Sequence, residues 1–280
     1  MTTLLDTHYH YDFLPPQART VFLDEIAGEG VEIVAQTLTP SGFLALEAEE
    51  KRRVEASSPG GPHPSGPTSP RLSVGFHPWS IGPDYQRELD IFAQALTRTR
   101  FVGEVGLDYV PRRLQQVPAE TQAEVFRRIL EIISSQRANV SYVLSIHAVR
   151  CAGQVCDALE ATDTSGMVPI FHRFGGSSDE LTRLIKQGGY ISVNPAMLAT
   201  KRGRAYVTQV SADRLLLETD LPESNKRGDD LGNNHARELI ATLNATVNTL
   251  ATLRHQDPDE LAVSIMRTAQ QLYGACPAGS

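Results

Sequence analysis

Short apolar runs alternate with longer amphipathic segments along most of the chain. Runs rich in β-branched residues and leucine predict strands at 4–10, 32–38, 72–77, 101–108, 141–147, 168–174, 190–194 and 215–220. Between them, apolar residues recur every three or four positions, which predicts helices such as 18–27, 118–136, 179–187 and 235–253. Alternating strands and helices predict parallel strands joined by right-handed crossovers.

Eight such units predict an α/β fold, a closed (β/α)8 TIM barrel that forms a single domain over 1–280. A doubly wound open sheet is the alternative, but no glycine-rich phosphate loop follows an early strand. Segment 57–70 is dense in proline and glycine, which predicts a flexible surface insertion on the side opposite the active face. Segment 257–273 predicts a closing helix on the barrel exterior.

Composition narrows the class of protein. The chain is 41% hydrophobic and 21% charged, which is typical of a soluble globular protein. We see no signal peptide and no apolar stretch of about 20 residues, so no membrane association is expected. Three sparse cysteines disfavour a disulfide framework and predict a cytoplasmic protein. The net charge of −7 argues against a protein that coats duplex nucleic acid, although it permits a local basic pocket. No protein partner is evident.

Metal-competent side chains stand at the ends of five predicted strands. His8 and His10 are two positions apart, so both point to one side of the first strand and can hold one ion. Later strands end in Glu104, His147, His172 and Asp220. Each alone is equally explained as a hydrogen-bonded core residue, half of an ion pair or a turn cap. In a barrel they converge on one mouth, where together they would be costly buried polar groups, so we favour a metal site.

The number of ligands suggests two ions. Six protein ligands exceed the three that a catalytic zinc usually takes. Two ions need a bridging ligand. Glu104 lies on a middle strand, and no strand carries a lysine at an equivalent place, so Glu104 is the expected bridge. Mixed imidazole and carboxylate ligands favour zinc, with magnesium, manganese or nickel as alternatives.

A family resemblance supports the same site. The segments that carry it are Asp6-Thr7-His8-Tyr9-His10, Gly75-Phe76-His77-Pro78, Gly103-Glu104-Val105-Gly106-Leu107-Asp108, Ile146-His147, Phe171-His172-Arg173-Phe174-Gly175-Gly176 and Glu218-Thr219-Asp220-Leu221-Pro222. In this order, over nearly the whole chain, they resemble the motifs of the TatD family of metal-dependent hydrolases. The resemblance implies a TIM barrel with phosphodiesterase or deoxyribonuclease activity. It also implies that one ion is held by His8, His10 and Asp220, the second by His147 and His172, and that Glu104 bridges them.

The chain departs from the family pattern near the substrate. Val149 stands where the family usually has an arginine, and Arg150 follows one place later. Arg173 stands where the family often has cysteine, and the segment after the last strand is only loosely matched, by Arg227 and residues 233–235. None of these positions belongs to the metal set, so the departures bear on substrate preference.

Basic residues follow several predicted strands, where they would ring the mouth of an acidic protein and focus an anionic substrate. We therefore expect Arg112, Arg150, Arg173 and Arg227 to bind substrate, and Phe174 to stack on a base. The alternative is that these arginines are ordinary solvated loop residues and that Phe174 is packing.

The predicted reaction is hydrolysis of a phosphodiester in DNA, single-stranded or bound at an end, by a TatD-like exonuclease. Asp220 would act as general base toward a water activated by the two ions. We expect His77 on the leaving-group side, and Asp108 as the residue that orients a ligand histidine. One alternative is a binuclear amidohydrolase or esterase that acts on a small molecule. Another is a barrel that binds metal or nucleic acid without turnover.

Overall fold

Parallel strands form the centre of the molecule. The computed structural model describes residues 3–56, 69–136, 141–222 and 232–274. The strands are β1 (Leu4–Tyr9), β2 (Val31–Ala35), β3 (Arg71–Leu72), β4 (Val74–Phe76), β5 (Phe101–Asp108), β6 (Tyr142–Val149), β7 (Met167–His172), β8 (Tyr190–Val193) and β9 (Leu215–Leu217). Pairing runs β1-β2-β3 and β4 through β9 in chain order, and every pair is parallel.

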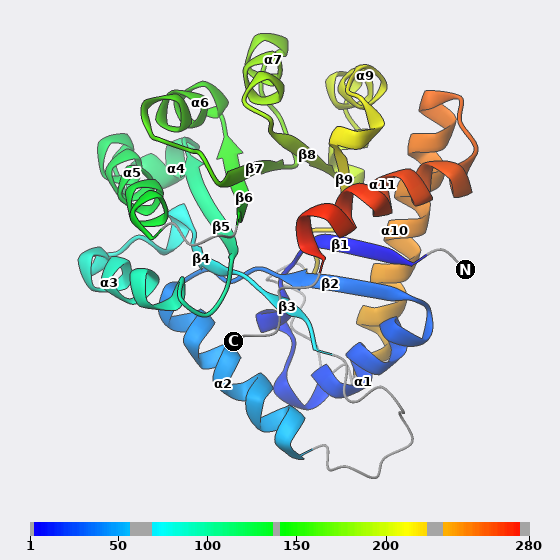
Figure 1. The fold of residues 1–280 in the computed structure, drawn as a ribbon, viewed down its shortest axis with the longest axis horizontal. Helices are drawn as coiled ribbons and strands as arrows, with labels where there is room; N and C mark the ends of the chain where they lie inside the picture. Colours follow the sequence, from blue (N-terminus) through cyan, green and yellow to red (C-terminus); the bar gives the residue numbers. More distant parts are fainter. Residues whose placement is uncertain (1–2, 57–68, 137–140, 223–231, 275–280) are drawn as a thin grey trace.

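The strands close into a barrel. β3 and β4 are two parts of the predicted third strand, interrupted at Ser73, whose backbone N–H donates to Ala35 O at 2.8 Å. Between β9 and β1, the N–H of Asp220 donates to His8 O at 3.0 Å. The N–H of His10 likewise donates to Leu221 O at 2.7 Å. The predicted (β/α)8 barrel is therefore confirmed (Figure 1).

The predicted strands 4–10, 168–174 and 190–194 end one or two residues early, at Tyr9, His172 and Val193, and two others end three residues early. The predicted strand 32–38 ends at Ala35, because the next residues bond to other strands: Thr37 N–H donates to Gly103 O of β5 at 3.2 Å. The predicted strand 215–220 ends at Leu217, and Asp220 adopts a left-handed conformation with φ 62°. Both differences lie at the mouth, where the chain leaves the regular ladder to place polar side chains.

Helices surround the strands (Figure 1). They are α1 (Pro16–Gly28), α2 (Pro40–Ala56), α3 (Tyr85–Ala95), α4 (Pro111–Leu114), α5 (Ala119–Ser135), α6 (Ala152–Ala161), α7 (Ser178–Lys186), α8 (Pro195–Leu198), α9 (Lys201–Gln209) and α10 (Asn233–Arg254), with 3-10 turns η1 (Tyr11–Phe13), η2 (Pro78–Ser80) and η3 (Ala212–Arg214). In α5, Val125, Ile129 and Ile133 form the buried stripe that its sequence pattern predicts. Among the described residues, no helix is long and apolar enough to cross a bilayer.

The last helix, α11 (Pro258–Tyr273), closes the amino end of the barrel. It contacts β1, β9 and η3. At its carboxyl end, Arg71 Nε donates to Tyr273 O at 2.9 Å, and Arg100 donates to Gly274 O at 3.1 Å. The predicted closing helix thus exists, but it lies over the barrel floor as well as outside it. Its apolar stripe covers core residues that the barrel alone would leave open to water. The predicted insertion at 57–70 falls largely outside the described residues.

Candidate metal centre

Glu104, on β5, lies at the centre of the polar cluster. Its Oε2 atom is 3.4 Å from His8 Nε2 and 3.6 Å from His10 Nε2. Its Oε1 atom is 2.6 Å from His147 Nδ1 and 3.0 Å from His172 Nε2. Each oxygen of one buried carboxylate therefore faces different histidines, with His77 Nε2 as a third neighbour of Oε1 at 3.5 Å.

Asp220 completes the first set of atoms, which we call the β1 group: His8, His10, Asp220 and Glu104 Oε2. Asp220 Oδ1 is 3.7 Å from His8 Nε2 and 3.4 Å from His10 Nε2. Ligands placed tetrahedrally at about 2.0–2.1 Å from one zinc lie about 3.4 Å apart. The observed spacings of 3.4–3.7 Å match that arrangement closely. His8 Nε2 is buried and makes no hydrogen bond within the described structure, as expected of a ligand atom.

The second set, the β6–β7 group, comprises His147, His172 and Glu104 Oε1. His147 Nδ1 and His172 Nε2 are 3.2 Å apart. The three spacings of 2.6–3.2 Å are shorter than those between ligands of one zinc, so these side chains would have to separate slightly to hold a second ion, with a coordination position left open. Overlapping clusters of potential ligands also include His77 with Glu104 and His147, and Glu218 with His8 and His172.

A carboxylate orients His147 from behind. Asp108 Oδ2 is 3.0 Å from His147 Nε2 and accepts a 2.7 Å hydrogen bond from Trp79 Nε1, while its Oδ1 accepts one from Val110 N at 2.9 Å. Burial opposes ionisation of Asp108, but these hydrogen bonds outweigh it and lower its pKa to about 2. The negative carboxylate therefore holds a proton on His147 Nε2, so Nδ1, which faces Glu104 Oε1, is the nitrogen that would bind an ion after losing its own proton.

Two further supporting residues were not predicted from the sequence. Ser145 Oγ is 2.8 Å from His8 Nδ1, and Glu218 Oε1 is 3.5 Å from His172 Nδ1. Each stands two positions before a predicted ligand, Ser145 before His147 and Glu218 before Asp220. In β6 the alternation of the strand places Ser145 and His147 on the same side, so that spacing was a usable signal; Glu218 and Asp220 lie beyond the end of β9, where alternation does not apply.

The charges of the cluster depend on one another. Burial opposes ionisation of Glu104, but the surrounding histidines hold its pKa well below the ordinary value. Burial also disfavours a charged His172, yet Glu104 and Glu218 raise its pKa well above the ordinary value. Burial likewise disfavours a charged His147, but Glu104 raises its pKa above the ordinary value. The pKa of His8, by contrast, is lowered by burial and by the neighbouring His172.

His77 borders the β6–β7 group. Its Nδ1 accepts a hydrogen bond from Trp79 N at 3.0 Å, so the neutral ring carries its proton on Nε2, 3.5 Å from Glu104 Oε1. Burial lowers the pKa of His77, which favours that neutral form. The ring therefore presents a hydrogen-bond donor to the site and is poorly suited to bind an ion.

Arg173 contacts the cluster directly. One guanidinium nitrogen lies 3.1 Å from Asp220 Oδ2, the oxygen not shared with the β1 group. Both residues have left-handed backbone, with φ 46° at Arg173 and φ 62° at Asp220. Non-glycine residues in this region cost about 1–3 kcal/mol each and persist where the surroundings enforce them.

The other predicted substrate residues differ in whether they are exposed at the mouth. Arg150 is exposed, and Arg112 lies with its guanidinium carbon 6.0 Å from the centre of the Trp79 ring, both beyond the carboxyl ends of strands. Phe174 is only 3% exposed, and its ring packs on Phe171 and Tyr206. Its position is that of a core residue, which leaves no face for a base to stack on. Arg227 lies outside the described residues.

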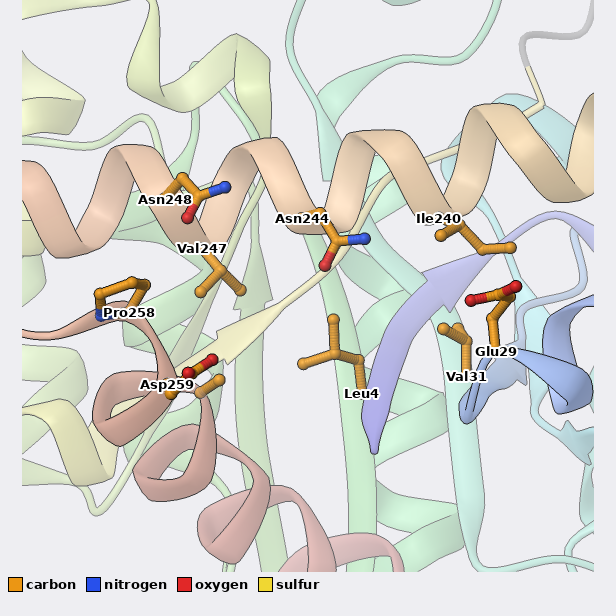
Figure 2. A pocket seen from close by; sticks show the side chains of 10 residues that line it. Leu4, Glu29, Val31, Ile240, Asn244, Val247, Asn248, Pro258 and Asp259 are labelled. Carbon is orange, nitrogen blue, oxygen red and sulfur yellow. The ribbon is translucent and has the colours of Figure 1, made fainter. Parts of the chain in front are cut away.

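A separate pocket lies at the amino end of the barrel (Figure 2). It has a volume of about 300 Å³ and lies where Leu4 and Val31 begin their strands. Asn244 and Val247 of α10 and Asp259 of α11 line its other sides. None of the lining residues belongs to the metal-ligand groups.

Comparison with known proteins places the chain in a broader context. The family model described as TatD related DNase matches residues 5–274. The chain is 32% identical over 166 residues to "Deoxyribonuclease Tat-D" of Schizosaccharomyces pombe, covering 54% of this chain and 50% of that protein. It is 30% identical over 176 residues to "3'-5' ssDNA/RNA exonuclease TatD" of Erwinia amylovora, covering 62% of this chain and 65% of that protein.

In both relatives the match leaves a third or more of the protein's length unaligned. Among solved structures, the TatD homologue YJJV of Escherichia coli K12 superposes with a TM-score of 0.72. That comparison covers 98% of each chain at 22% identity, so it supports the fold.

Proposed function

Because the chain belongs to the TatD related DNase family, we propose that it is a divalent-metal-dependent hydrolase of phosphodiester bonds, specifically a deoxyribonuclease. The observation that carries the proposal is the position of Glu104, whose two oxygens face different histidines. A carboxylate placed this way suits a bridge between two ions, which is an arrangement used for in-line displacement at phosphorus.

We assign zinc to both positions first, with magnesium, manganese or nickel as alternatives. His8, His10 and Asp220 would hold one ion, His147 and His172 the other, and Glu104 both. Support comes from the ligand spacing of the β1 group and from the mixture of imidazole and carboxylate donors.

When bound, the ions would lower the pKa of water and stabilise negative charge on the phosphoryl oxygens. Asp220 is the residue placed to take up the proton. Burial opposes its ionisation, but His10, His172 and His8 hold its pKa below the ordinary value, so it is a carboxylate at neutral pH. Its side chain is 22% exposed, so a water at the mouth can reach the carboxylate.

Two other side chains would act on the substrate. His77 donates a hydrogen bond from Nε2 toward the leaving oxygen or a phosphoryl oxygen. Arg173 holds Asp220 Oδ2 in place and presents its remaining donors at the mouth, since the side chain is 42% exposed. Arg112, beside the exposed Trp79, is the second cation that we expect to contact a phosphate.

We further propose that the substrate is single-stranded and bound at an end. The Erwinia relative is named a 3'-5' ssDNA/RNA exonuclease, and a mouth with separate cations suits a flexible strand. A cytoplasmic location remains a prediction from composition.

The test is a digestion assay on labelled single-stranded DNA that has either a free 3' or a free 5' end, with metal analysis of the purified protein. We expect stepwise shortening from one end, loss of activity after chelation, and recovery with a divalent metal. Hydrolysis of amides or esters with no cleavage of any phosphodiester would instead establish the amidohydrolase alternative.

A further inference from the structure

A second pocket opens at the mouth of the barrel, between the segments that follow β6 and β7. Its volume is about 250 Å³. The lining residues are Ala148, Arg150, Cys151, Ala152, Gly175, Gly176, Ser177, Glu180 and Arg202, and we call this the 150/202 pocket. Pockets for whole drug-sized ligands span about 300–1,000 Å³, so this one suits a smaller group.

Residues that line the 150/202 pocket follow the metal-centre histidines closely in the sequence. Ala148 directly follows His147, and Gly175 comes three residues after His172. Both walls therefore start from the strands that carry the β6–β7 group. The pocket therefore borders the same face of the barrel as the metal centre, where a bound strand could contact both.

Positive charge dominates the pocket. The guanidinium of Arg150 has no hydrogen bond or ion pair among the described residues, and Arg202 makes one long contact of 3.5 Å to Gly176 O. The carboxylate in the pocket, Glu180, is bonded to another lining residue: its Oε2 accepts hydrogen bonds from Ser177 N at 2.6 Å and Ser177 Oγ at 2.8 Å. Two cations thus face the pocket with donors to spare.

The backbone supports a functional interpretation. Arg150 is left-handed, with φ 61°, which is unfavourable for a residue with a side chain. Strain of this kind concentrates where a side chain must be aimed at a ligand. Gly176 forms the opposite wall, where an added Cβ would lie 2.7 Å from Phe174 Cζ and 2.8 Å from Ala152 Cβ. The pocket is therefore shaped by fixed neighbours and not by a loose surface loop.

We infer that the 150/202 pocket binds the phosphate adjacent to the scissile one, so that the protein acts on strands with at least two phosphates. Arg150 and Arg202 would each donate to its oxygens, as guanidinium groups do in bidentate phosphate recognition. This inference rests on the proposed phosphodiester hydrolysis and specifies its substrate class.

The experiment compares three substrates and two variants. Bis(4-nitrophenyl) phosphate and the dinucleotide dTpdT carry one phosphate, whereas the trinucleotide dTpdTpdT carries two. Arg202→Ala should raise KM for the trinucleotide about tenfold and change both one-phosphate substrates less than about twofold, because one charge-assisted hydrogen bond is lost only where a second phosphate exists. Lys201→Ala is the matched control: it removes one exposed charge from the neighbouring residue, which does not line the pocket.

The outcomes separate the two proposals. An equal effect of Arg202→Ala on all three substrates, or no effect on any, overturns the phosphate pocket while hydrolysis itself stands. If the unaltered protein cleaves none of them, the proposed function fails. Binding of fluorescein-labelled dTpdTpdT to the protein as purified then decides the pocket. A Kd about tenfold weaker in Arg202→Ala than in Lys201→Ala supports it, and equal Kd values overturn it.

Discussion

The β1 group and the β6–β7 group obtain their negative charge in different ways. In the β1 group, Asp220 contributes a carboxylate directly among the ligand atoms. In the β6–β7 group the extra carboxylates stand behind the rings, Asp108 behind His147 and Glu218 behind His172. The β1 group thus offers four protein ligands and the β6–β7 group three.

This difference assigns separate tasks to the two halves. A set of four ligands resembles a closed site, which holds its ion firmly. A set of three leaves room for a substrate oxygen, while the carboxylates behind the rings maintain ring orientation and ligand basicity. Glu104 belongs to both halves, so changes at Glu104 should affect both, whereas changes behind one half should affect that half alone.

The largest expected effect is that of Glu104→Ala, which removes the ligand common to both groups. We expect metal content to fall in both and turnover to drop by about 10³-fold or more, because ion-supplied stabilisation is worth several kcal/mol. Metal analysis and initial rates measure both effects. Glu104→Gln controls for folding, since it preserves the shape of the buried side chain. Full activity in Glu104→Ala would contradict the two-ion arrangement.

Asp220→Asn separates the ligand role of Asp220 from its proposed proton uptake. Asparagine keeps an oxygen toward the β1 group but cannot accept the proton, so kcat should fall about 10²–10⁴-fold while metal binding weakens less. Steady-state kinetics at saturating metal, with metal titration in parallel, make the comparison. An unchanged kcat would remove Asp220 from the proton-transfer step.

Asp108→Asn tests the support behind the β6–β7 group. Losing a charged partner of a metal-binding histidine typically costs about 10–100-fold in metal affinity or activity. We expect this loss for one ion only, with the ion of the β1 group retained. Zinc titration followed calorimetrically measures the two steps. The exposed Glu131, paired with Arg127, provides a control in Glu131→Gln, which should leave both steps unchanged.

Acidification should release the ion of the β6–β7 group first. A metal ligand must be neutral, and the pKa of both His147 and His172 is raised, so protons compete with the metal as the pH falls through those values. In the β1 group the pKa of His8 is lowered, whereas burial disfavours a charged His10 but Asp220 and Glu104 raise its pKa, so one imidazole of this group competes for protons against two in the β6–β7 group. Affinity should fall about tenfold per pH unit for each proton displaced. Zinc titrations of Asp220→Asn and Asp108→Asn between pH 8 and 6 report on the two groups separately, and earlier release from the β1 group would reverse the comparison.

The smallest effect is expected at Arg150. Arg150→Gly removes the side chain and relieves a left-handed backbone that costs about 1–2 kcal/mol, while the freedom of glycine in the unfolded chain offsets about 0.5–1 kcal/mol of this, so the free energy of unfolding should rise by up to about 1 kcal/mol while the KM for oligonucleotides increases. Thermal denaturation and kinetics on the same preparation test it. A loss of stability would mean that Arg150 contributes to packing, and an unchanged KM would mean that it does not bind substrate.

The barrel could be predicted because its long strands, such as β5 and β6, are apolar runs separated by helical patterns. The boundaries of β5 were predicted without error. The places where strands are interrupted or end early were not predictable. The interruption at Ser73 and the early end of β9 depend on hydrogen bonds to other strands, which no local pattern reveals. The position of α11 over the floor likewise depends on contacts distant in sequence, such as Arg71 to Tyr273.

Residues that converge by topology were easier to predict than residues that depend on orientation. Barrel geometry brings every strand end to one mouth, so the six ligand candidates could be grouped from the sequence. Orientation could not be inferred in the same way. Phe174 turns into the core, and Arg113, which shares helix α4 with Arg112, is buried and donates to Pro78 O and Ile81 O. Ser145 and Glu218 could have been found only by examining the residue two positions before each predicted ligand.

The most direct test of the central claim is a crystal structure of the zinc-loaded protein with anomalous scattering recorded at the zinc edge. The account predicts two peaks about 3.5–4 Å apart, one beside Glu104 Oε2 among His8, His10 and Asp220, the other beside Oε1 between His147 and His172. A single peak, or two peaks of which only one contacts Glu104, would contradict the bridging role on which the proposed function rests.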